Sequence, residues 1–325
     1  MSEEVEQNYH VFSIGSNNGV DIYEISDKFT FFNAKWYHFW VYWKIALMVV
    51  KMNPDLIITS LWRSHLIGIL IKLMNHKSKV VCFIHNSRFV HFFDGLVTRI
   101  YLKFCDLVLT DSNSAKSFVE EYISKNKTKI SVIDLIFPVQ KSLVSRGFNK
   151  REINRLIFVG RVSKQKNLHG CIRFLSELHK KGLYFHYDIY GQDEGLKEEL
   201  IKLAQEIGIL DYVHFYGAVG FFDVQPLLSR YRFMLQLSFF EGFGMSVVES
   251  LQVGTIPIVT PVGESISYCS NDINSILVTE SLIEAVERIA LLSEQDVFDM
   301  SEAAKITFCS VDYFPTAFTN YISSC

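Results

Sequence analysis

Strand-like and helix-like segments alternate along almost the whole chain. Short apolar runs rich in Val and Ile are followed by segments whose apolar residues recur every three or four positions. Strands joined by helices pair in parallel, and the helices cover both faces of the sheet. The expected strands are 54–59, 79–84, 106–110, 130–133, 155–159, 185–190, 213–216, 231–237 and 256–260. The pattern predicts an α/β fold.

The same reading gives the helices and the division into domains. Residues 138–153 are polar and show no apolar period, so they are the candidate linker between two domains. A chain of 325 residues is long enough for two domains of ordinary size. We expect two short strands, 11–15 and 20–25, around a turn at 16–19. The expected helices are 65–74, 94–103, 112–124, 168–180, 196–207 and 224–231.

The segment 34–51 is aromatic and mostly apolar, but His38 and Lys44 interrupt it and it is too short to span a membrane. It forms either a buried helix or one lying at a membrane interface. The surrounding residues 28–103 hold eleven Lys and Arg against two acidic residues, Asp55 and Asp94. A basic, aromatic-rich half favours an anionic membrane surface or a phosphate-bearing partner.

The cysteines and the first residues of the chain help to predict the cellular compartment of the protein. The six cysteines are scattered without a Cys-x-x-Cys pair, which favours free buried thiols over a zinc site or a redox pair. The first residues are acidic and lack the basic-then-apolar pattern of a secretory signal. We therefore expect a cytoplasmic protein, associated with the inner face of the cell membrane.

The stretch 241–249 carries two carboxylates eight positions apart, Glu241 and Glu249, with Gly242 and Gly244 after the first. It follows an apolar strand and leads into a helix, so we expect Glu241 in the loop and Glu249 about two turns into the helix. A helix start offers unpaired N–H groups and a partial positive charge, and glycines let a ligand approach closely. The stretch is therefore either an anion-binding site or a buried strand-to-helix turn in which the glycines only allow the chain to change direction.

A second strand–turn–helix junction lies at 158–167. Gly160 ends the strand, and Arg161 and Lys166 follow it before the next helix. A guanidinium and an ammonium at such a place could clamp a diphosphate. The alternative is a solvated basic loop. In two successive α/β domains, ligands bind at the carboxyl ends of the strands.

Four motifs in order resemble the retaining glycosyltransferases of the GT-B fold, glycosyltransferase family 4 (glycosyl transferases group 1). The similarity covers residues 150–262 and includes a Gly-Arg-x4-Lys-Asn run and a Glu-Gly-Phe-Gly run with its second Glu. The motifs lie at 160–167, 190–200, 241–249 and 252–259. The resemblance implies two Rossmann-like parallel-sheet domains that face each other across a cleft. It divides the chain into an acceptor-side domain 1–140, a nucleotide-sugar domain 141–308 and a helix 309–325 returning to the first domain.

The resemblance also implies roles for individual residues. Arg161 and Lys166 would hold the diphosphate of the donor, Glu241 would bind sugar hydroxyls near the reacting carbon, and Glu249 the ribose hydroxyls. In the first domain the family has a His at the end of a strand that faces the donor sugar, and His85 fits that position; the alternative is a structural histidine. We read His65, His76 and His91 as structural or surface residues. The remaining donor-binding residues would be Gly160, Gly191, Gly242, Phe243, Gly244 and Met245.

No Asp-x-Asp occurs in the sequence, so the short motif that holds a divalent ion on a sugar nucleotide is absent. The resemblance implies a metal-independent reaction without a cofactor, with retention of anomeric configuration by front-face attack. Neither glutamate is then a nucleophile, and their separation is not that of a glycosidase pair.

The expected function is transfer of a hexose-type sugar from a UDP- or GDP-sugar to a glycan or lipid-linked glycan, in bacterial surface polysaccharide synthesis (O-antigen, capsule or lipopolysaccharide). The partners would be the donor, the acceptor and, through residues 28–103, the membrane surface, with no nucleic acid. The alternatives are a non-catalytic sugar-nucleotide-binding partner of another transferase, another GT-B enzyme such as a sugar-nucleotide epimerase, or an unrelated two-domain binding protein.

Overall fold

The structure is a computed structural model that describes residues 10–15, 29–33, 38–74, 77–89, 91–123, 129–139, 143, 147–279 and 281–324. The chain divides into two compact units, one of Met1–Ile133 with Tyr321–Cys325 and one of Asp134–Asn320, and each is described by itself. The strand expected at 20–25, the turn at 16–19 and His76 lie outside the described residues.

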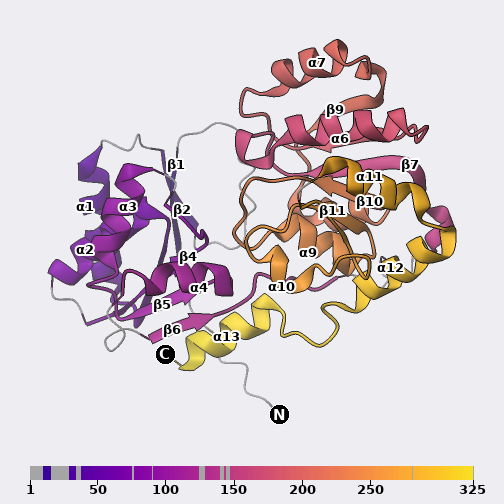
Figure 1. Ribbon diagram of the computed structural model, residues 1–325. Helices are drawn as coiled ribbons and strands as arrows, with labels where there is room; N and C mark the ends of the chain where they lie inside the picture. The colour runs from indigo at the N-terminus through magenta and orange to yellow at the C-terminus, as the bar shows by residue number, and fades with distance from the viewer. Residues whose placement is uncertain are drawn as a thin grey trace. The chain divides into compact units, whose positions relative to one another are not determined.

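The first unit contains a parallel pair of strands and a four-stranded parallel sheet with the order β3-β4-β5-β6 (Figure 1). Each strand of the larger sheet is joined to the next by a helix, as the alternation predicts. The strands are β1 (Val11–Gly15), β2 (Phe29–Asn33), β3 (Leu56–Ser60), β4 (Lys79–Ile84), β5 (Leu107–Thr110) and β6 (Lys129–Val132). The helices are α1 (Phe39–Met52), α2 (Trp62–Leu73), α3 (Phe92–Tyr101) and α4 (Asn113–Glu120).

Helix α1 has one buried face and one exposed face. The segment 34–51 is therefore neither a fully buried helix nor a helix without contacts to the core. Its inner face packs with Ile67 and Ile71 of α2 in one apolar cluster. Its outer face leaves Trp40 64% and Trp43 50% exposed. The buried positions follow the helical period: Val41, Tyr42, Ile45, Ala46 and Val49.

The second unit is built on a six-stranded parallel sheet with the order β12-β11-β10-β7-β8-β9. Neighbouring residues of β7 point to opposite faces, so that Phe158 joins one apolar cluster and Ile157 the other. The strands are β7 (Glu152–Val159), β8 (His186–Tyr190), β9 (Val213–Gly217), β10 (Tyr231–Gln236), β11 (Ile256–Val259) and β12 (Ile276–Leu277). The helices are α6 (Leu168–Lys180), α7 (Lys197–Glu206), α8 (Val224–Leu228), α9 (Met245–Gln252), α10 (Ser265–Tyr268), α11 (Leu282–Leu291) and α12 (Glu294–Ile306). The last helix, α13 (Phe314–Ser324), begins in this unit, and its residues from Tyr321 onward belong to the first unit.

Strand order in this sheet reverses beside β7. From β7 the chain adds β8 and β9 on one side, and then crosses to add β10, β11 and β12 on the other. The helices that follow β7 and β10, α6 and α9, therefore pack on opposite faces of the sheet. Open α/β sheets bind ligands at such a switch point.

The polar stretch 138–153 is not a linker along its whole length, which corrects the prediction. Phe148–Lys150 form a 3₁₀ turn, and β7 already begins at Glu152. Arg151 is only 3% exposed, and its guanidinium donates hydrogen bonds to the backbone carbonyls of Val253 and Gly254. The polar side chain belongs to the fold because it satisfies carbonyl groups that a helix end leaves unpaired.

The described cysteines are free thiols. Cys82, Cys105, Cys171 and Cys269 are buried, as predicted, whereas Cys309 is exposed and differs from the prediction. Within the described ranges, no helix is long and apolar enough to cross a membrane.

Candidate functional site

The loops after β7 and β10 are fastened to each other. The backbone N–H of Phe239 donates to the carbonyl of Gln165 at 2.9 Å, and the Gln165 amide donates back to the carbonyl of Phe240 at 3.0 Å. Beside these bonds, Lys166 Nζ lies 2.7 Å from Glu241 Oε1. The structure thus brings together two predicted site residues that are 75 positions apart in the sequence.

Glu241 is a buried carboxylate in a dense set of donors. Its Oε1 accepts from Gln236 Nε2 at 3.0 Å and from Ser238 Oγ at 2.5 Å, as well as from Lys166. The side chains of Lys166 and Glu241 are only 12% and 8% exposed. A buried carboxylate needs such partners, and charge-assisted hydrogen bonds of this kind hold its position closely.

Helix α9 begins directly after the two glycines. Gly244 has φ +77, and a Cβ there would lie 2.7 Å from the Tyr268 hydroxyl. That hydroxyl donates to the carbonyl of Phe243 at 2.6 Å and so fixes the turn. The backbone N–H groups of Gly242, Phe243, Gly244 and Met245 donate no hydrogen bond to any described residue. Four open donors at a helix start can receive an anion.

Glu249 is the fifth residue of α9, little more than one turn from its start, and not the two turns expected. It is 8% exposed, and burial raises the pKa of its carboxyl to about 7. No described residue forms a hydrogen bond or an ion pair with it. An acceptor of this kind, buried and unpaired, can accept from hydroxyl groups of a ligand.

Arg161 and Lys166 have different surroundings. Arg161 is exposed, and its guanidinium lies 2.7 Å from Glu194 Oε1 in the loop after β8. The two loops also meet at Gly160 and Gly191: a Cβ on Gly191 would lie 1.6 Å from the Gly160 carbonyl oxygen. Gly191 is therefore required by close backbone packing, and Arg161 lies on a loop that this packing holds.

In the first unit, His85 follows β4 and lies between the ends of two neighbouring strands. Its Nε2 is 2.7 Å from Oγ of Ser60, the last residue of β3. Its Nδ1 is 3.4 Å from Oδ2 of Asp111, directly after β5. The carboxyl ends of three adjacent parallel strands thus supply one cluster of polar side chains.

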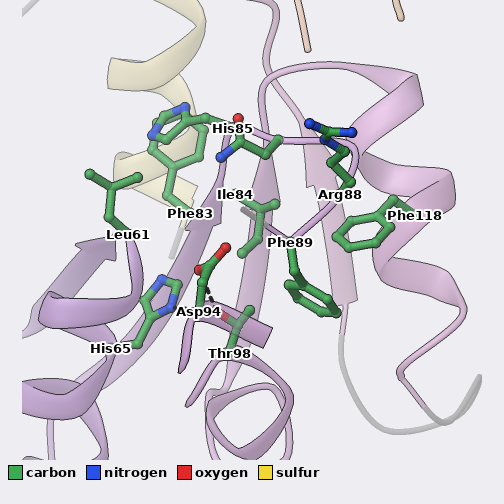
Figure 2. Close-up of a pocket in the computed structure, with 11 residues that line it drawn as sticks. Leu61, His65, Phe83, Ile84, His85, Arg88, Phe89, Asp94, Thr98 and Phe118 are labelled. Carbon is green, nitrogen blue, oxygen red and sulfur yellow. Dashed lines mark hydrogen bonds between the residues drawn. The ribbon is translucent and has the colours of Figure 1, made fainter. Parts of the chain in front are cut away.

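A pocket opens beside this cluster (Figure 2). It is a hollow of about 310 Å³, open solvent included, and combines aromatic side chains with His85, Arg88 and Asp94. His65 forms part of the wall but is itself buried, and burial together with the nearby His85 lowers its pKa to about 3. His65 is therefore a neutral structural residue, as predicted. His91 is also structural, since its ring accepts from the Asp94 N–H at the start of α3.

Comparison with known families agrees with this geometry. The model of the family "Glycosyl transferases group 1" matches residues 143–306, about half of the chain. The chain belongs to this family. A second model, "Glycosyltransferase Family 4", matches residues 5–135, so the two matches together cover both units.

Two curated relatives of this glycosyltransferase family are mannosyltransferases by name. The GDP-mannose:cellobiosyl-diphosphopolyprenol alpha-mannosyltransferase of Xanthomonas oryzae pv. oryzae is 27% identical over 66% of this chain and 56% of its own length. The O-antigen chain mannosyltransferase RfbU of Salmonella typhimurium is 25% identical over 70% of this chain and 62% of its own length. The chain thus spans less than two thirds of either relative.

Solved structures show that the fold is GT-B, with two Rossmann-like parallel-sheet units. HepE of Anabaena, crystallised with UDP and glucose, matches with a TM-score of 0.75 and 18% identity over 91% of this chain and 86% of its own. Sucrose-phosphate synthase of Thermosynechococcus elongatus matches with a TM-score of 0.75 and 17% identity over 97% and 90%. At this identity the likeness establishes the fold alone.

Sequence reasoning missed the residues that support the named site residues. Gln236 and Ser238 bind Glu241, and Ser60 and Asp111 flank His85, yet none of the four lies in a recognised motif. The available signal was position: each lies within two residues of the end of a predicted parallel strand. Side chains at that edge of a sheet are candidates for any site there.

Proposed function

We propose that this protein transfers a hexose-type sugar from a nucleotide diphosphate sugar to a glycan or lipid-linked glycan acceptor, with retention of configuration and without a metal ion. The proposal rests chiefly on one observation: the Lys166–Glu241 pair adjoins a helix start with four open N–H groups. A diphosphate needs positive charge and N–H donors, and a sugar needs a fixed carboxylate. The Lys166 ammonium, the amides at the start of α9 and the Glu241 carboxylate are groups of these kinds, and they support the proposal.

The proposed roles are those that the family resemblance implies, and the chemistry of each group is compatible with its role. The α9 amides together with Arg161 and Lys166 neutralise the leaving diphosphate. Glu241, held by Lys166, accepts hydrogen bonds from sugar hydroxyls, and Glu249 accepts from the ribose hydroxyls. His85 of the first unit acts on the donor sugar. No step uses a protein nucleophile: the leaving phosphate helps to remove the proton of the acceptor hydroxyl during front-face attack.

The names of relatives guide the choice of substrates. The Xanthomonas relative is named for GDP-mannose and for a diphosphopolyprenol-linked acceptor, and RfbU for O-antigen chains. HepE was crystallised with UDP and glucose. We propose a mannose donor and a polyprenyl-linked glycan acceptor, in the synthesis of a bacterial surface polysaccharide.

Thermal shift with GDP, UDP, GDP-mannose and UDP-glucose tests donor binding, because a bound ligand raises apparent stability by mass action. Transfer to a polyprenyl diphosphate disaccharide, followed by mass spectrometry, tests the reaction, and NMR of the product gives the anomeric configuration. Activity in EDTA tests metal independence.

Binding without any transfer would favour the non-catalytic donor-binding alternative, and conversion of the donor sugar alone would favour an epimerase. No response to any nucleotide would reject the proposal.

We further propose that the first unit contacts an anionic membrane surface through the outer faces of α1 and α3. Both of these helices pack on α2. Each presents four exposed apolar residues at positions i, i+1, i+4 and i+8, which is one stripe along a helix. The stripes consist of Phe39, Trp40, Trp43 and Leu47 on α1, and of Phe92, Phe93, Leu96 and Ile100 on α3.

Exposed lysine and arginine side chains accompany both stripes: Lys44 and Lys51 on α1, and Arg99 and Lys103 at the end of α3. Aromatic residues bordered by basic ones suit the headgroup region of an anionic bilayer, where rings insert and cations meet phosphate. A lipid-linked acceptor would be presented at such a surface.

A further inference from the structure

The two ring nitrogens of His85 have different neighbours: a carboxylate lies near Nδ1 and a hydroxyl near Nε2. Asp111 is 2% exposed, and its carboxylate needs partners because burial removes it from water. Its Oδ1 accepts from the Ser112 hydroxyl at 3.0 Å, and its Oδ2 faces His85 Nδ1 at 3.4 Å. No lysine or arginine of the described residues forms an ion pair with it. The imidazole of His85 is therefore the group that faces this buried charge.

The carboxylate decides which ring nitrogen carries the proton. An ionised Asp111 can only accept, so an unprotonated Nδ1 would set two lone pairs against each other. The proton of the neutral ring therefore belongs on Nδ1, and Nε2 is left as the acceptor. At Nε2 the Ser60 hydroxyl, 2.7 Å away, fits that assignment because a hydroxyl can donate. A ring hydrogen-bonded at Nε2, with a carboxylate 3.4 Å from Nδ1, favours one tautomer and one orientation.

We propose that Asp111 and Ser60 are positioning residues for His85, which fix its ring in the Nδ1–H tautomer with Nε2 as a hydrogen-bond acceptor. The proposal rests on the role of His85 in sugar transfer given above, but it makes a separate statement about the ring itself. Three strand ends build the arrangement: Ser60 ends β3, His85 follows β4 and Asp111 follows β5. The ring of Phe83 packs against His85 with centroids 4.0 Å apart and closes one side.

The direct test is ¹⁵N NMR of the histidine rings in the unmodified full-length protein at a pH where His85 is neutral. The His85 signals are assigned by their loss in His85→Gln. We expect the proton on Nδ1 and a free lone pair on Nε2. A proton on Nε2, or an average of both tautomers, would overturn the proposal. This measurement requires no activity, so it holds even if the protein transfers no sugar.

Variants test the link to catalysis. Asp111→Ala should shift the proton toward Nε2 and lower kcat about 10- to 100-fold, with little change in the KM for the donor, because a misplaced group costs rate more than binding. Ser60→Ala should lower kcat in the same way, and Ser60→Thr, which keeps the hydroxyl, should restore it. An unchanged tautomer in Asp111→Ala would refute the positioning role. A shifted tautomer with unchanged kcat would leave that assignment standing and refute the role of His85 in transfer.

Discussion

Glu249 is a carboxylate on α9 whose burial raises its pKa to about 7, and this makes a testable statement about stability. The unfolded chain has the ordinary pKa of 4.5. Between pH 4.5 and 7 the folded protein therefore binds more protons, and the contribution of Glu249 to stability falls as the pH rises through this window.

Glu249→Gln removes that charge. We expect the variant to be more stable than the wild type at pH 8, by up to about 3 kcal/mol, and equally stable near pH 4.5. Urea denaturation at both pH values measures this, with Glu198→Gln on the exposed face of α7 as the matched control. The same variant should bind the nucleotide more weakly, because an amide replaces the acceptor for ribose hydroxyls. Equal pH dependence in variant and wild type would contradict the burial effect.

The Lys166–Glu241 pair contributes to the stability of the fold and is proposed to act in sugar transfer. A double variant separates the two contributions. Lys166→Met alone leaves the buried Glu241 charge without its cation and should destabilise the protein by roughly 3 kcal/mol. Adding Glu241→Gln removes the unpaired charge, so stability should recover while transfer stays lost. Denaturation curves and a transfer assay measure the two effects. A double variant that transfers at the wild-type rate would show that the proposed roles of both residues are wrong.

At the scale of elements, the junction of the loops after β7 and β8 depends on Gly191. A Cβ at this position would lie 1.6 Å from the Gly160 carbonyl, so the two loops must separate to admit one. Gly191→Ala should therefore destabilise the protein by about 1–3 kcal/mol and weaken nucleotide binding, because Arg161 shifts with its loop. Thermal denaturation and calorimetry measure this. Gly147→Ala is the control, since its Cβ would meet nothing within 4 Å; a similar loss in both variants would contradict the packing explanation.

The alternation of strands and helices could be predicted because each element carries its own period. Helix α6 has the predicted bounds, since Asn167 caps its start and Gly182, at φ +80, follows its end. The predicted element boundaries were wrong where two neighbouring elements could both include the same residues. The helix expected over 224–231 ends at Leu228 because Tyr231 already pairs with β7 as the first residue of β10.

The candidate site could be predicted in its motif residues but not in its contacts. Glu241 and Lys166 are recognisable in sequence, but their pairing depends on β7 and β10 being neighbours in the sheet. The same holds for Asp111 and His85, which require β4 beside β5. Strand order arises from packing of the whole unit, and a local pattern does not contain it.

At the scale of the whole molecule, the first unit carries exposed apolar side chains arranged in stripes along two of its helices. Its stripes on α1 and α3 include Phe92, which is 77% exposed, and Trp40, which is 64% exposed. Large apolar side chains gathered in a stripe on a helix mark a binding site more often than chance exposure does. With lysine and arginine beside them, we expect binding to vesicles of phosphatidylglycerol and phosphatidylethanolamine, and much weaker binding to phosphatidylcholine alone.

Variants of the first unit decide whether this surface is responsible. Trp40→Glu with Trp43→Glu should abolish vesicle flotation while the protein stays folded, because both side chains point outward. Lys44→Gln and Lys103→Gln should each weaken binding about fivefold, as expected for roughly 1 kcal/mol per cation near the surface, and added salt should reduce this difference. Leu291→Glu in the second unit, at a side chain 83% exposed, is the control for an added charge. Undiminished flotation of the double tryptophan variant would reject the α1 stripe, and equal binding to phosphatidylcholine would reject the electrostatic part of the proposal.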